Sequence, residues 1–181
     1  RTKLSGAGGT VAEYAAAAKK SGLQFLVFLE TFENMSPEKL DQLKKECAES
    51  SDDTFLCVPG LYIKDNRGNN QHYFGRSIVW PGKEFLTPDG KMFDVHAREG
   101  ASGLPHISFV LSNIASKDSI GYFGFKKSDI SAMWNMKLYS SAGLVLYEDG
   151  KETEGLKDNM ESYLEVQNAA GNIQPLAIDL V

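Results

Sequence analysis

The sequence predicts an α/β fold in which helices alternate with buried strands. Residues 10–22 and 36–47 have apolar positions at helical spacing, and each is followed by a short apolar run, at 25–29 and 54–58 respectively. Repeated helix and strand units imply parallel strands with right-handed crossovers, in an open sheet or a barrel. The chain has 181 residues, 42% of them hydrophobic, which suffices for one sizeable core. We therefore expect a single domain over residues 1–181.

The first helix is predicted to begin after Thr10. Glu13 follows three residues later, so the two form a capping box that satisfies free backbone N–H groups. Gly22 is a natural end for this helix. One apolar stripe is expected on it, formed by Val11, Tyr14, Ala15 and Ala18. The uninterrupted apolar run at 25–29 then predicts a strand covered on both faces.

The second helix is predicted to begin at Ser36 and Pro37, because proline is favoured at the first helical position. Its inner face is expected to consist of Leu40, Leu43 and Cys47. The strand that follows, at 54–58, is expected to end at Pro59 and Gly60.

Beyond Gly60 the pattern changes to strands and turns. A polar stretch at 65–70 separates strand-like residues 61–64 from 72–80, which predicts a hairpin. The C-terminal half is predicted to be less regular and rich in strands. Its candidate segments are a buried segment at 105–112, a short aromatic strand or turn at 121–125, strands at 142–147 and 175–181, and a helix at 156–167.

Composition excludes several classes of function. The net charge is −5 and no Lys/Arg cluster occurs, so a nucleic-acid partner is not expected. The run at 25–29 is too short to cross a bilayer, and we expect a soluble chain without a membrane span. The two cysteines, Cys47 and Cys57, are expected to be buried thiols. Because the first residue is Arg1, we expect an excerpt of a longer protein. The sequence does not indicate in which cellular compartment the protein is located.

The first sixty or so residues resemble the start of a PHP domain, of the polymerase and histidinol phosphatase superfamily. The stretch KLSGAGGTVAEYAAAAKKSGLQFLVFLET follows that family's order of loop, alanine-rich helix and strand. The family's Pro-Gly-x-Glu landmark is matched by Pro59, Gly60, Leu61 and Tyr62, and its next histidine corresponds to His72. The resemblance covers about a third of the chain and implies a PHP-like distorted β/α barrel.

The departures from the family pattern fall on its metal ligands. Arg1 stands in place of a histidine, Leu29, Glu30 and Thr31 replace Thr-Asp-His, and Tyr62 replaces a glutamate. A multinuclear metal site needs carboxylates and neutral imidazoles, whereas a guanidinium offers no lone pair. Glu30 and His72 are the remaining candidates for a catalytic or metal-binding role. No cofactor is expected, although the binding of a residual Mn or Zn ion by these two residues is kept as an alternative.

Each candidate also has a structural interpretation. Glu30 is more readily a hydrogen-bonded carboxylate at a strand end, and His72 a packed strand histidine. A group of aromatic residues also has two interpretations: a platform for stacking a sugar or, as we favour, part of a core or interface. The group consists of Tyr122, Phe123, Phe125 and Trp134.

Two functions follow from the resemblance. The favoured one is a degenerate, non-catalytic PHP-like domain, used as a binding, structural or assembly module in a larger protein, with a protein partner or with itself. Carbohydrate binding would be a specific form of it. The alternative is a metal-dependent phosphoesterase-type hydrolase with a reduced or relocated metal site.

Overall fold

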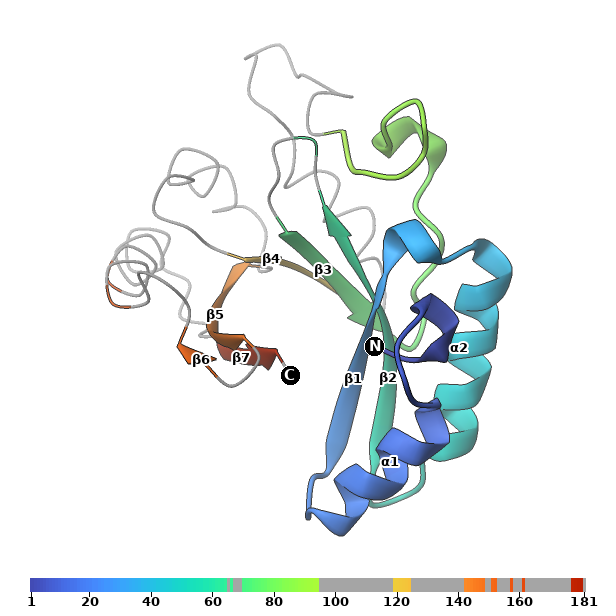
Figure 1. The fold of residues 1–181 in the computed structure, drawn as a ribbon, viewed down its shortest axis with the longest axis vertical. Helices are drawn as coiled ribbons and strands as arrows, with labels where there is room; N and C mark the ends of the chain where they lie inside the picture. The colour runs from blue at the N-terminus through green and yellow to red at the C-terminus, as the bar shows by residue number, and fades with distance from the viewer. Residues whose placement is uncertain are drawn as a thin grey trace.

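The computed structural model describes residues 1–64, 66, 70–94, 119–124, 142–148, 151–152, 157, 161 and 177–180. The described α-helices lie on one side of the parallel strand pair (Figure 1). The helices are α1 (Val11–Lys20) and α2 (Pro37–Ser50), and the strands are β1 (Phe25–Thr31), β2 (Leu56–Lys64), β3 (Asn70–Gly75), β4 (Ser119–Gly124), β5 (Ala142–Glu148), β6 (Lys151–Glu152) and β7 (Ala177–Leu180). Short 3-10 turns lie at η1 (Lys3–Ser5), η2 (Phe32–Asn34) and η3 (Lys83–Phe85).

Both helices begin as predicted. The Glu13 backbone N–H donates to Thr10 Oγ1 at 3.2 Å, and the Thr10 N–H donates to Glu13 Oε2 at 2.7 Å. Ser36 Oγ caps α2 by accepting from the Lys39 N–H at 3.3 Å. Neither helix of the described part of the chain has the length and apolar run that a membrane span requires.

The helices bury the faces that the sequence predicts, with one exception. The residues that pack into the core are Val11, Ala15 and Ala18 of α1 and Leu40, Leu43 and Cys47 of α2. Tyr14 is 39% exposed, because its ring lies at the margin of α1 and leans on Phe28, with 6.2 Å between the ring centroids. Cys47 and Cys57 are buried free thiols, as predicted, and burial raises the pKa of both.

The predicted PHP-like β/α barrel is wrong. β1 and β2 pair in parallel. The sequence predicts that the second strand ends at Pro59 and Gly60, but β2 runs through both residues and continues to Lys64. The connection to β3 covers only residues 65–69, whereas a crossover to a parallel strand takes roughly a dozen residues or more. The chain therefore returns antiparallel in the predicted hairpin, without another helix. The described strands form an open, mixed sheet in the order β1-β2-β3-β4-β5-β6, with β1 at one edge and β7 beside β5.

The C-terminal strands confirm part of the predicted pattern. β4 pairs antiparallel with β3, and β5 pairs in parallel with β4 and β7. These strands fall within or beside the segments predicted at 121–125, 142–147 and 175–181. The buried segment predicted at 105–112 lies outside the described residues, as does most of the helix predicted at 156–167.

Replacing Gly60 with alanine is expected to lower the free energy of unfolding by about 1–3 kcal/mol, the usual range for overpacking. A Cβ atom at Gly60 would lie 2.8 Å from the Phe28 carbonyl oxygen and 2.8 Å from Phe74 Cβ, neither of which moves easily. Urea unfolding measures the loss. Gly8→Ala is the matched control, because a Cβ atom there meets nothing within 4 Å. Equal midpoints for the two variants would contradict this account.

Candidate functional site

The register of the sheet separates Glu30 from His72. Residues paired across neighbouring strands share a face, and successive residues alternate between faces. Glu30 pairs with Leu61, which pairs with Tyr73, and this row faces the helices. The next row runs through Thr31, Tyr62 and His72, on the opposite face. The structure therefore does not bring the Glu30 carboxylate and the His72 imidazole together, and one ion could not bind both.

Glu30 lies at the C-terminal end of β1 and is fully buried. Its Oε2 accepts hydrogen bonds from the Thr2 backbone N–H, at 3.0 Å, and from Ser5 Oγ. Asn34 Nδ2 in turn donates to the Ser5 carbonyl oxygen at 3.0 Å. Oε1 is buried and has no hydrogen-bond partner within the described residues. The geometry agrees with the structural interpretation of Glu30, a carboxylate that anchors the start of the chain.

The anchored segment covers the end of the parallel strand pair. It is tied to itself by hydrogen bonds from the Lys3 N–H to the Gly9 carbonyl, at 2.7 Å, and from the Ala7 N–H to the Thr2 carbonyl, at 2.9 Å. In open α/β sheets this edge, at the carboxyl ends of the strands, is the usual ligand site. Here Thr2 and Ser5 are buried against Glu30 and occupy the space on the helix side.

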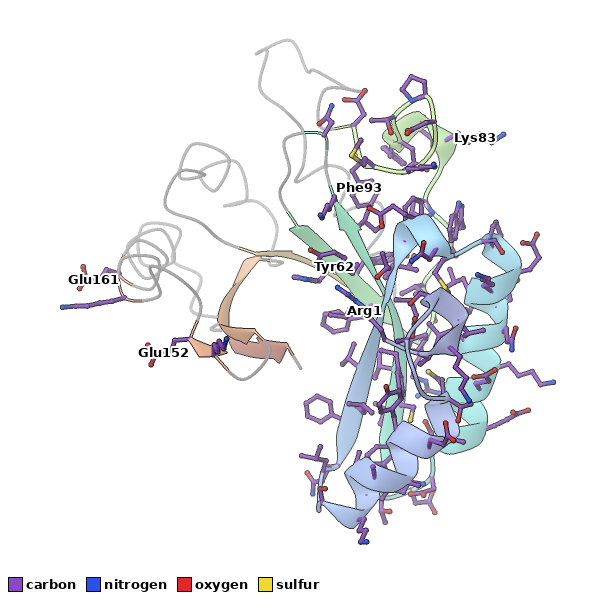
Figure 2. All side chains as sticks on the ribbon, in the orientation of Figure 1. Arg1, Tyr62, Lys83, Phe93, Glu152 and Glu161 are labelled. Atoms are coloured by element: carbon purple, nitrogen blue, oxygen red, sulfur yellow. The ribbon has the colours of Figure 1, made fainter. Side chains whose placement is uncertain are left out.

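On the other face, Arg1, Tyr62 and His72 form a layered cluster. The Arg1 guanidinium carbon lies 5.3 Å from the Tyr62 ring centroid, within the range of a cation–π contact (Figure 2). The rings of Tyr62 and His72 are 5.3 Å apart and tilted. Burial lowers the pKa of His72 to about 4, so its imidazole is neutral at pH 7. A neutral imidazole can ligate a metal, but the nearby guanidinium repels a divalent cation.

The other predicted site residues are placed only in part. Tyr122 and Phe123 lie on β4, at register positions opposite His72 and Gln71. Phe125 and Trp134 lie outside the described residues. Within the described ranges, no three His, Cys, Asp or Glu residues gather in a way that could hold a metal ion.

Comparison with protein-family models and with curated proteins finds no match to this chain.

An exposed apolar patch is the feature that the sequence missed. Phe25 and Leu56 are register partners at the starts of β1 and β2, and they are 63% and 38% exposed. Val27, Leu29 and Val58 beside them are only half-buried. The run at 25–29 predicts burial on both faces, but both described helices pack on one face only. An apolar run by itself does not distinguish a strand that is covered on both faces from a strand that has one face exposed.

Proposed function

We propose that this chain is a non-catalytic assembly module that binds a second copy of itself along β1. The observation that carries the proposal is the 63% exposed Phe25 ring, beside Leu56 on the face of the sheet away from the helices. Contiguous exposed apolar side chains on a folded domain indicate an interaction site. At Phe25 this surface coincides with an open sheet edge, so both side chains and backbone are available to a partner.

The edge strand lacks the usual protection against pairing. Exposed edges are normally blocked by charges, proline or bulges, because their free N–H and C=O groups recruit other strands. Residues 23–29, LQFLVFL, contain no charge and no proline. The described chain places β2 on one side of β1 and no strand on the other. Such an edge favours a strand-to-strand interface.

The β1 sequence is complementary to itself in antiparallel pairing. A twofold axis at Val27 would set Phe25 opposite Leu29, so that the exposed ring covers a half-buried leucine. In the same register Glu30 lies opposite Gln24, and no two like charges meet. Dimers with twofold symmetry need this self-matching pattern, and β1 supplies it over its whole length.

The non-catalytic part of the proposal rests on the surroundings of Glu30 and His72, the two candidate metal ligands. Glu30 Oε2 is engaged by Thr2 and Ser5, and His72 lies on the other face beside Arg1 and Tyr62. The resemblance of the first sixty residues to PHP domains supports descent from a metal-dependent scaffold. Stoichiometric Mn or Zn in the purified protein, lost in a Glu30→Ala/His72→Ala variant, would overturn this part alone.

Phe25→Lys is expected to weaken self-association at least tenfold, because it puts a charge opposite Leu29 of the second copy, within an apolar contact. Sedimentation velocity over a concentration series measures the dimer fraction of each protein. Val79→Lys is the matched control, since Val79 is also exposed, at 59%, and lies outside β1. A wild-type protein that stays monomeric, or a Phe25→Lys variant that still dimerises, would overturn the proposed assembly.

A further inference from the structure

A cavity lies at the opposite end of β2 from the Glu30 anchor. Its volume is about 830 Å³, and it is lined by the last turns of α2, the start of β2 and residues 76–77. Small-molecule sites typically measure roughly 300–1,000 Å³. The cavity is therefore within the size range of a small-molecule site.

The floor of the cavity is apolar and rigid. Cys47, Cys57 and Pro59 are buried there. The Ser51 hydroxyl donates to the Cys47 carbonyl at 2.8 Å and accepts from the Cys57 N–H at 2.9 Å. These bonds tie α2 to β2 and satisfy a carbonyl of the last helical turn. Because both thiols are buried with raised pKa values, they serve as apolar lining and not as nucleophiles.

The rim carries two cations and one neutralised acid. Lys44 and Arg76 both line the cavity, and no described residue pairs with the Arg76 guanidinium. Lys44 Nζ is 3.5 Å from Asp41, an exposed contact that a ligand can replace. The acid, Asp52, is held by Lys19 Nζ at 2.5 Å. The rim therefore has spare positive charge directly above an apolar floor.

We infer that this cavity binds an amphipathic organic carboxylate, with its apolar body on the Cys47, Cys57 and Pro59 floor and its carboxylate against Arg76 and Lys44. A guanidinium matches a carboxylate with two parallel hydrogen bonds, which fixes the orientation of such a ligand. Ser77 also lines this cavity, and a serine hydroxyl can donate a further hydrogen bond to a carboxylate. The inference does not rest on the proposed assembly, since no residue of β1 lines the cavity, although Leu56 borders both the cavity and the apolar patch.

Titration calorimetry of the full chain with decanoate tests the inference. Decanol is the control that keeps the alkyl chain but carries no charge. Inorganic phosphate is the control that is an anion but has no apolar part. Decanoate is expected to bind at least tenfold more tightly than either. Arg76→Gln is expected to weaken decanoate at least tenfold and to leave decanol unchanged. Ala48→Trp, which fills the cavity, is expected to weaken both. Lys45→Gln is the matched control, because Lys45 lies on the same helix but outside the cavity lining, paired with Glu49.

Four results would overturn the inference. They are no binding of decanoate at millimolar concentration, equal affinities for decanoate and decanol, phosphate binding as tight as decanoate binding, and an unchanged affinity in Arg76→Gln. Phe25→Lys separates the cavity from the β1 patch. Decanoate binding should survive that substitution, and its loss there would place the ligand on the patch and contradict the cavity site.

Discussion

Glu30→Ala is expected to lower the free energy of unfolding by about 3 kcal/mol. A buried donor that loses its acceptor costs roughly 1–3 kcal/mol, and Glu30 Oε2 accepts from two such donors. Alanine would leave the Thr2 N–H and the Ser5 hydroxyl buried without this acceptor. The start of the chain should therefore detach from the end of β1 before the rest of the sheet unfolds.

Urea unfolding measures the loss of stability, and hydrogen exchange of residues 2–9 reports whether the segment detaches. Ser5→Ala should show an intermediate loss, because it removes one of the two donors. Glu33→Ala is the control, a nearby glutamate that is exposed to solvent. Wild-type stability in Glu30→Ala, or unchanged exchange in the segment, would show that the carboxylate is not the anchor.

His72 is expected to make the protein less stable as the pH falls from about 6.5 to about 4. Burial lowers the pKa of His72 to about 4 in the folded state, whereas an unfolded histidine titrates near 6.5. Between these values the unfolded chain binds more protons, so acid favours unfolding, by about 3 kcal/mol over the whole window. Above about pH 6.5 neither state binds the proton, and this dependence vanishes.

The measurement compares wild type with His72→Phe by urea unfolding at pH 7, 6 and 5. Phenylalanine keeps a ring against Tyr62 but cannot titrate. Carboxylates titrate in both proteins, so their effects cancel in the difference. Wild type should lose about 2 kcal/mol more than the variant between pH 7 and pH 5. Parallel pH profiles would contradict a buried, neutral His72.

Local signals in the sequence predicted the helices well, and the same signals failed at Pro59 and Gly60. The Thr10 and Ser36 caps act within three residues of themselves, so no distant contact is needed to identify them. A Pro-Gly pair usually ends a strand, but here β2 continues through it. Gly60 allows this because it lies in close contact with Phe28 and Phe74, from the strands on either side. Those contacts exist only after the sheet has formed.

The sequence alone determined the helix starts, the β1 segment and the hairpin. Only the tertiary structure decided that the described strands form an open sheet, that Phe25 is exposed, and that Glu30 and His72 lie on opposite faces. The reason is physical. Caps and turns are interactions between residues a few positions apart, whereas the register and coverage of a strand depend on partners that may be far along the chain.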